Sequence, residues 1–260
     1  MTRKNLKTGL AAAVALCLVT LLFLFWSDTP LGRARAVNKL VDQNVAARGG
    51  DEPWRDVSSL RLTGQMDVGK GMSVPYVLEQ KRPNKMCLEF VFEGETAVQC
   101  SDGTSGWKLE PYRGRTAPEP MTEAELREVA DSADLYGLLF DYDARGHTVE
   151  LLGHEPVQER DAIKLKVTLP GGAVRWVYVD AESGLEIKVD AMRRVGGRER
   201  RVETFYHDWQ ETEGLLIPRR QETRTEGNNE SHFLTVETVR VNPPLDDSRF
   251  AMPATAEMVR

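Results

Sequence analysis

Residues 162–180, which read AIKLKVTLPGGAVRWVYVD, show most clearly the strand pattern from which the fold can be predicted. In the first half of this stretch, apolar and polar side chains alternate, a pattern typical of a β-strand with one buried face. The apolar set is Ile163, Leu165, Val167 and Leu169. Gly171-Gly172 then marks a tight turn, and a second alternating run follows. Strands joined this closely must be antiparallel neighbours, because a parallel crossover needs about a dozen residues.

The same unit of strand and short turn recurs through most of the chain. We predict strands at residues 58–68, 74–81, 85–92, 96–101, 106–110, 148–152, 162–169, 174–180, 185–194, 198–209, 215–225 and 231–241. They form a meander of about eleven or twelve strands, and a sheet of this length must curl. Its concave side then needs apolar cover.

Two helical segments are the candidates for that cover. Residues 30–48 place apolar side chains at helical spacing, and Gly49-Gly50 stops the helix. Residues 123–133 form the second helix, with Thr122 as its N-cap and Glu125 completing a capping box. Residues 111–120, rich in Pro and Arg, are predicted to be a loop. The sequence therefore predicts one α+β domain over residues 37–260.

The amino terminus is predicted to be an export segment. Residues 1–8 are basic, and residues 10–26 contain no charge, which is the order of a secretory signal. Two interpretations of residues 1–36 remain open. Ala34-Arg35-Ala36 has the small-x-small form of a cleavage site, whereas an uncleaved anchor would place Trp26 at the interface of the bacterial inner membrane. In both cases the body is exported, and we expect it to face the periplasm.

The charges of the chain are unevenly distributed. Its 34 basic and 40 acidic residues give a net charge of −6. Residues 1–36 hold five basic residues and one acid, a net of +4, so the remaining 29 basic and 39 acidic residues give −10. An acidic body argues against nucleic acid as a partner, because binding to phosphate backbones needs clustered positive charge.

Few residues have the spacing of a catalytic or metal site. The four histidines form no helical i, i+4 pair, and neither HExxH, CxxC, GxSxG nor a phosphate-binding loop occurs. We therefore expect no metal, no cofactor and no enzymatic activity. One charged stretch stands out, the basic run from Arg193 to Arg201. It fits either a site for lipid phosphates or an acidic partner, or a hairpin tip whose charges keep the strand edges soluble.

Cys87 and Cys100 lie on strands that we expect to be adjacent. A two-residue turn at Glu93-Gly94 would place them opposite each other, and a disulfide would form in an oxidising compartment. A three-residue loop gives a cleaner apolar face but turns Cys87 to the other side of the sheet. Both registers remain open.

Several motifs in the body resemble the bacterial outer-membrane lipoprotein-sorting proteins, relatives of the periplasmic carriers LolA and LolB. They occur in family order and cover nearly the whole body. The motifs are Ala47-Arg48-Gly49-Gly50 with Trp54, Ser59-Leu60-Arg61-Leu62-Thr63-Gly64, Lys81-Arg82-Pro83-Asn84-Lys85-Met86, Asp102-Gly103-Thr104-Ser105-Gly106-Trp107, Val179-Asp180-Ala181-Glu182-Ser183-Gly184-Leu185, Glu203-Thr204-Phe205-Tyr206, Gly214-Leu215-Leu216-Ile217-Pro218 and Phe250-Ala251-Met252-Pro253. The resemblance implies an unclosed β-barrel whose concave face encloses helices and a cavity for acyl chains.

From the resemblance and the apolar strand faces we expect a monomeric binder of lipid or lipoprotein acyl chains. The candidate lining residues are Met86, Leu88, Phe90, Val98, Trp107, Leu109, Leu138, Leu139 and Phe140. The alternative is an envelope sensory or interaction module of the same fold, which binds a membrane protein. Each lining residue is equally consistent with plain core packing.

Overall fold

The computed structural model describes residues 29–69 and 71–253. The chain divides into two compact units, residues 1–43 and 44–260, and the second unit carries the sheet. Helix α2 (Pro30–Ala47) includes the Ala34-Arg35-Ala36 triplet. The proposed anchor at residues 10–26 lies outside the described part of the chain. None of the helices within that part is long and apolar enough to cross a membrane.

The second unit is built on one sheet, which has thirteen strands among the described residues. The strands are β1 (Ser59–Gly69), β2 (Met72–Lys81), β3 (Lys85–Phe92), β4 (Glu95–Ser101), β5 (Gly106–Glu110), β6 (Arg115–Pro120), β7 (Thr148–Val157), β8 (Arg160–Thr168), β9 (Val174–Asp180), β10 (Glu186–Val195), β11 (Arg198–Thr212), β12 (Leu215–Thr225) and β13 (Ser231–Val241). The short helices are α3 (Asp51–Asp56), η1 (Pro111–Arg113), α4 (Glu123–Ala133) and η2 (Asp247–Phe250).

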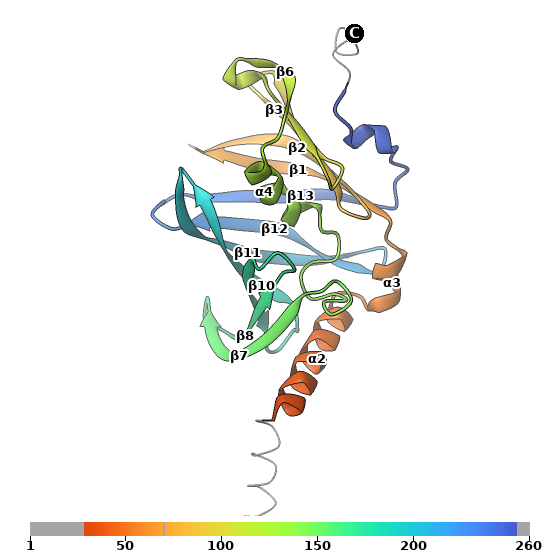
Figure 1. Cartoon of the computed structure of the whole chain (residues 1–260), viewed down its shortest axis with the longest axis vertical. Coiled ribbons are helices and arrows are strands. Elements are labelled where there is room, and N and C mark those ends of the chain that lie inside the picture. Colours follow the sequence, from red (N-terminus) through yellow and green to blue (C-terminus); the bar gives the residue numbers. More distant parts are fainter. Residues whose placement is uncertain (1–28, 70, 254–260) are drawn as a thin grey trace, which may run out of the picture. The chain divides into compact units, whose positions relative to one another are not determined.

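Two antiparallel meanders make up this sheet (Figure 1). The strands β1–β6 follow one another in one direction and β7–β13 in the other. The meanders join where β1 pairs with β13, for example Leu62 with Val239. Strands β6 and β7 form the two ends of the sheet and do not pair with each other, so the sheet is not closed. The predicted α+β class and the open, curled antiparallel sheet are confirmed.

The sequence prediction was wrong at two places in the sheet. Residues 111–120, expected to be a loop, contain η1 and strand β6. Pro111, Pro118 and Pro120 made this segment resemble a loop. The two prolines within β6 are tolerated because β6 is an edge strand. Strand β7 extends beyond residue 152 to Val157, because a register shift between Leu151 and Gly153 lets the pairing continue past the glycine.

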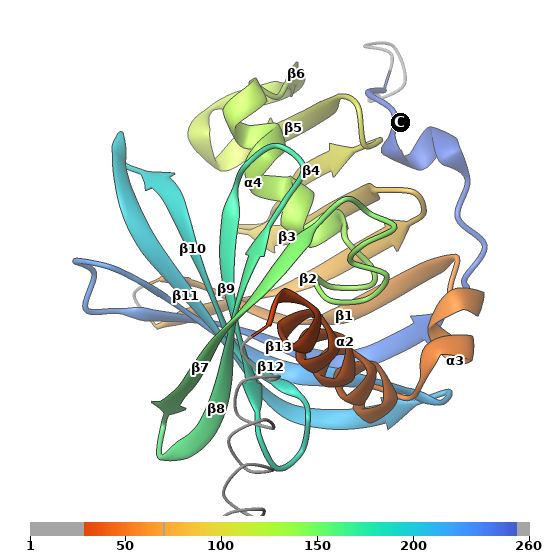
Figure 2. The same ribbon diagram turned by 60° about the horizontal axis from the view of Figure 1, so that its bottom comes forward.

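Helix α4 lies over strands β3–β5 (Figure 2). Its predicted capping box is present, since the Glu125 amide donates to Thr122 Oγ1 (3.3 Å) and Glu125 Oε2 accepts from the Thr122 amide (2.8 Å). Gly106 permits the close approach to β5. A Cβ at this position would lie 2.7 Å from Met121 Sδ and 2.8 Å from Leu126 Cδ2.

The alternation of β5 defines the two faces of the sheet. Lys108 forms an ion pair with Glu125 of α4, so we call this side the inner face. Trp107 points to the opposite, outer face, where its Nε1 donates to Phe250 O (3.2 Å). A tight group, which we call the outer cluster, consists of Cys87, Val98, Cys100, Trp107 and Phe250. The chain beyond β13 therefore covers the outer face of β3–β5.

Strands β3 and β4 pair in the register of a two-residue turn. Glu93 and Gly94 both have positive φ (53° and 82°), as a type I′ turn requires. Cys87 is paired directly with Cys100, and the two side chains form a disulfide in the structure. Because Met86, Leu88 and Phe90 alternate with Cys87, they lie on the inner face.

Candidate functional site

The inner face encloses a cavity of about 740 Å³. Its walls come from strands far apart in sheet order, with β2 and β4 on one side and β9–β12 on the other, and α4 contributes Leu126 and Ala130. The aliphatic lining consists of Leu60, Leu62, Leu78, Leu126, Ala130, Ala133, Leu135, Leu138, Leu169, Val177, Val189, Ala191, Val202, Leu216, Ile217 and Leu234. The volume is within the range of about 300–1,000 Å³ that small-molecule sites occupy.

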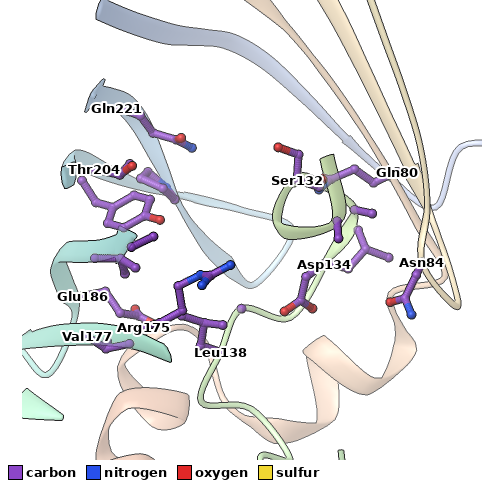
Figure 3. A pocket seen from close by; sticks show the side chains of 18 of the residues that line it. Gln80, Asn84, Ser132, Asp134, Leu138, Arg175, Val177, Glu186, Thr204 and Gln221 are labelled. Carbon is purple, nitrogen blue, oxygen red and sulfur yellow. The ribbon is translucent and has the colours of Figure 1, made fainter. Parts of the chain in front are cut away.

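A charged group shares the cavity wall with these apolar residues. Its members are Arg48, Asp134, Arg145, His147, Arg175, Glu186 and Arg193. Figure 3 shows Arg175 and Asp134 extending into the cavity from opposite sides, with Leu138 below and between them. Gln221 and Thr204 lie above Arg175, and Ser132 and Gln80 lie above Asp134. The cavity is therefore amphipathic.

Arg48 links the charged wall to the loop that joins α4 to β7. Its guanidinium donates to Tyr136 O (2.5 Å), lies 3.6 Å from Glu186 Oε1 and stacks over the Trp54 ring (4.5 Å). The Arg48 carbonyl accepts from Trp54 Nε1 and from the Leu216 amide, both at 2.9 Å. Two polar atoms of this group, Arg48 Nε and Glu186 Oε2, are buried without a hydrogen-bond partner in the part of the chain that the structure describes.

Asp134 and Arg145 form an ion pair of 2.7 Å within the same loop. Burial raises the pKa of Asp134, while Arg145 acts in the opposite direction. His147 Nδ1 lies 3.1 Å from Leu138 O, and Arg145 also donates to Gly137 O (2.6 Å). These bonds hold the loop in a single conformation beside the cavity.

The loop is also anchored through its apolar side chains. Leu135 and Phe140 are buried in a core cluster with Trp54 and Leu215, and Tyr136 stacks on Phe140 with ring centroids 4.6 Å apart. Helix α4 differs from this loop, because most of its side chains are exposed and its cavity-facing residues are small or half-buried. The loop is part of the core, whereas α4 is held chiefly at its first turn.

The structure separates the nine predicted lining residues into three groups. Leu138 lines the cavity, and Leu139 and Phe140 are buried within the same loop. Met86, Leu88 and Phe90 lie on the inner face but outside the cavity lining. Val98, Trp107 and Leu109 are on the outer face, where they pack around Phe250. The candidate residues from β3 and those from β4 and β5 therefore lie on opposite faces of the sheet, because Phe90 pairs with Ala97 and Val98 with Glu89.

Sequence reasoning missed most of the walls that the structure brings together. Val177, Val189 and Ala191 come from β9 and β10, which the sequence had marked only as alternating strands. The signal was present in Arg175, which shares a strand face with Val177 and Val179 and is 9% exposed. An arginine on an otherwise apolar strand face indicates a polar feature inside the fold.

No group of three or more His, Cys, Asp or Glu side chains within residues 29–69 and 71–253 is suited to hold a metal ion. His147, the histidine in the cavity lining, is directed to a backbone carbonyl.

Comparison with solved structures places this architecture in a known class, the LolA-like fold. A LolA superfamily protein from Nitrosomonas europaea superposes with a TM-score of 0.55 at 14% identity, covering 84% of this chain and 97% of the other. A domain assigned to outer-membrane lipoprotein-sorting proteins, from Vibrio parahaemolyticus, gives 0.53 at 13% identity, with 82% and 94% covered. A DUF1329 family protein from Desulfovibrio piger gives 0.55 at 13%, with 83% and 97% covered.

The likeness is one of fold. No protein-family model matches the sequence, and no curated protein matches it. The chain has the LolA-like fold that its sequence motifs resemble.

Proposed function

We propose that this protein binds an acyl chain of a lipid or lipoprotein in the inner-face cavity, on the periplasmic side of the envelope. The observation that carries the proposal is the cavity of about 740 Å³, walled by aliphatic side chains from both meanders. Each CH₂ group transferred from water into such a site contributes about 0.8 kcal/mol. The fold shared with lipoprotein-sorting proteins supports the same class of ligand.

The charged wall would receive the polar end of that ligand. Arg175 and Arg145 lie beside the aliphatic lining, and two polar atoms of Arg48 and Glu186 are buried without hydrogen bonds in the described chain. An ester carbonyl reaching this wall would accept a hydrogen bond from Arg48 Nε, and a hydroxyl or ammonium of a headgroup would donate one to Glu186 Oε2. Both bonds would be favourable, since leaving a buried polar atom unpaired is costly. The ligand would thus be an amphiphile rather than a plain hydrocarbon.

Helix α4 is the element that an incoming chain would displace. Leu126 and Ala130 cover the cavity, while the capping box and the Lys108–Glu125 ion pair hold the first turn of the helix. At its other end, Gln80 Nε2 donates to Ser132 O (2.6 Å). An acyl chain and the apolar side of α4 would compete for one surface, so binding and release would accompany movement of the helix about its first turn.

The proposal is tested by the uptake of a fluorescent fatty acid by the delipidated protein. Val189 lies on the cavity wall and is partly exposed, so Val189→Trp should fill the cavity. We expect saturable uptake by the wild type and at least about tenfold weaker uptake by the variant. Equal uptake by both proteins, or none by the wild type, would rule out this cavity as the site.

A second candidate function is an interaction module for a membrane-protein partner, and one observation favours it. The edge strand β7 carries Leu151 and Leu152, which are 39% and 48% exposed. An unpaired edge with exposed apolar side chains is suited to strand addition by a partner. Leu152→Lys should abolish capture of such a partner while fatty-acid uptake stays unchanged.

We further propose that the protein acts by binding and not by catalysis. The ionisable side chains of the cavity are engaged with one another, as in the pairs Arg145–Asp134 and Arg48–Glu186. This arrangement suits recognition of a polar group and leaves no activated nucleophile in the described lining.

A further inference from the structure

The hairpin between β10 and β11 ends in a strongly basic tip. We define the tip as residues 192–201, which read MRRVGGRERR, with five arginines and one glutamate for a net charge of +4. The turn is formed by Gly196 and Gly197, with φ of 59° and 79°. Residues 37–260 carry a net charge of −10 with the tip included, so the rest of this part of the chain carries −14 and the tip stands out as positive.

The arginines are distributed over both faces of the hairpin. Val195 pairs with Arg198 and Arg194 with Glu199, so successive side chains point to opposite sides. Arg198 and Arg200 share the side of Arg193, which lines the cavity, whereas Arg194 and Arg201 share the other side with Met192. The tip therefore presents positive charge on both sides of the hairpin.

Most of these charges are not neutralised by the protein. Within the described chain, no carboxylate forms a salt bridge with Arg194, Arg198, Arg200 or Arg201. Two of these side chains donate to backbone carbonyls instead. Arg200 donates to Glu226 O at 2.6 Å, and Arg194 donates to Gly197 O at 3.3 Å. Several arginines elsewhere are paired with carboxylates, as in Arg55–Asp141 and Arg249–Glu79, both at 2.7 Å. The guanidinium groups of Arg194, Arg198 and Arg201 thus remain available to an external anion.

Apolar side chains accompany the arginines. Met192 is 38% exposed and Val195 is 39% exposed. They are two of the eight large apolar side chains that the described chain leaves exposed, and both lie within these ten residues. Arginines flanking exposed apolar side chains match a membrane interface, where the cations meet phosphates and the apolar groups enter the headgroup boundary.

We propose that the β10–β11 tip docks the protein onto the surface of an anionic lipid bilayer. Arg194, Arg198 and Arg201 would contact lipid phosphates, and Met192 and Val195 would enter the interface. The tip adjoins the cavity, since Arg193 lines it and donates to Glu128 O of α4 at 3.4 Å. Docking would bring the cavity to the membrane, but it requires no acyl-chain binding.

The test uses the full chain held in phosphatidylcholine nanodiscs, so that any insertion of residues 10–26 is satisfied beforehand. These discs are mixed with protein-free vesicles of phosphatidylglycerol and phosphatidylethanolamine, or of phosphatidylcholine alone, and co-flotation is measured at low and high salt. We expect binding only to the anionic vesicles, and weaker binding at high salt.

The decisive variant is Arg194→Ser/Arg198→Ser/Arg201→Ser. Since each basic residue near an anionic surface contributes roughly a fivefold factor, the triple variant should bind roughly a hundredfold more weakly. The matched control, Arg113→Ser/Arg127→Ser/Arg240→Ser, removes the same charge from exposed positions elsewhere and should retain binding. Met192→Ser/Val195→Ser should weaken binding at both salt concentrations.

Three results would overturn the proposal. They are absence of wild-type flotation with anionic vesicles, unchanged flotation of the triple variant, and an equal loss in the control. Capture of an acidic peptide without vesicle binding would assign the tip to a protein partner instead. Circular dichroism of each variant confirms that the surface substitutions leave the fold intact.

Discussion

The inner and outer faces of the sheet are built from the same kind of alternating strands, yet part of the inner face is hollow, whereas the outer face of β3–β5 is filled. On the outer face, Phe250 and Leu245 from the chain beyond β13 complete a solid cluster around the Cys87–Cys100 disulfide. On the inner face, a cavity of about 740 Å³ lies between β1, β2 and α4 on one side and β9–β12 on the other. The difference is that the outer cover inserts an aromatic ring, whereas α4 presents small and half-buried side chains.

This contrast predicts that the outer face carries stability and the inner face carries binding. The largest effect should follow Phe250→Ala, because Phe250 is 1% exposed and its removal opens a cavity in the outer cluster. We expect a loss of about 3–5 kcal/mol in the free energy of unfolding, measured by urea denaturation. Fatty-acid uptake by the remaining folded protein should stay at the wild-type level. A parallel loss of uptake would contradict the assignment of binding to the inner face alone.

A somewhat smaller loss should follow removal of the outer-face disulfide. Cys87→Ala/Cys100→Ala frees a loop closed across 13 positions, which should cost about 2–4 kcal/mol. Urea denaturation of the wild type with reductant should reproduce the shift, and the variant should then be insensitive to reductant. A reductant effect of equal size in the variant would show that the bond is not its source.

Enlarging one valine on each face compares the faces directly. Val98 is 6% exposed in the outer cluster, so Val98→Trp should destabilise the protein by about 1–3 kcal/mol through overpacking. Val189→Trp should cost less than about 1 kcal/mol, because the cavity accepts the ring. Thermal unfolding of both variants checks the difference, and similar losses would mean that the inner face is as densely packed as the outer one.

The smallest effect concerns the anchor of α4 and depends on pH. The hydrogen bond from Lys108, with those from Thr122, lowers the pKa of Glu125 from 4.5 to about 2. The folded protein therefore binds this proton less readily than the unfolded chain does. The stabilisation is complete above about pH 4.5 and is lost as the pH falls through about 2.

Glu125→Gln keeps a capping side chain but removes the charge. At neutral pH we expect a loss of about 1 kcal/mol or less in the free energy of unfolding, since the pair is partly exposed. This gap from the wild type should close as the pH approaches about 2. Glu128→Gln, on the same helix but without the Lys108 contact, should show no such pH dependence; if it does, the ion pair is not responsible.

Local patterns in the sequence predicted much of this fold. Alternation and turn residues identified twelve of the strands, and Thr122 with Glu125 located the start of α4. The pairing of β1 with β13 could not be predicted from the sequence, because no short turn joins these two strands. Strand β6 was hidden by its prolines, which only an edge position tolerates.

The candidate site was predicted less well than the fold, for a physical reason. Alternation shows that Val98 and Phe90 each face something apolar, but it does not reveal that Phe250 covers Val98, that Phe90 packs in an inner core cluster, or that the cavity lies elsewhere on the inner face. Which face is filled depends on the path of residues 242–253 after the last strand. The cavity walls at Val177 and Val189 similarly follow from the curl of the whole sheet.

The claim that the inner face holds an acyl chain is tested most directly by native mass spectrometry of protein purified from its own envelope. We expect the wild type to carry an additional mass that is released as an acyl lipid or acylated peptide. Val189→Trp should lack this mass, while Val98→Trp, where folded, should retain it. A wild type without bound lipid, or the same bound mass in Val189→Trp, would contradict the account.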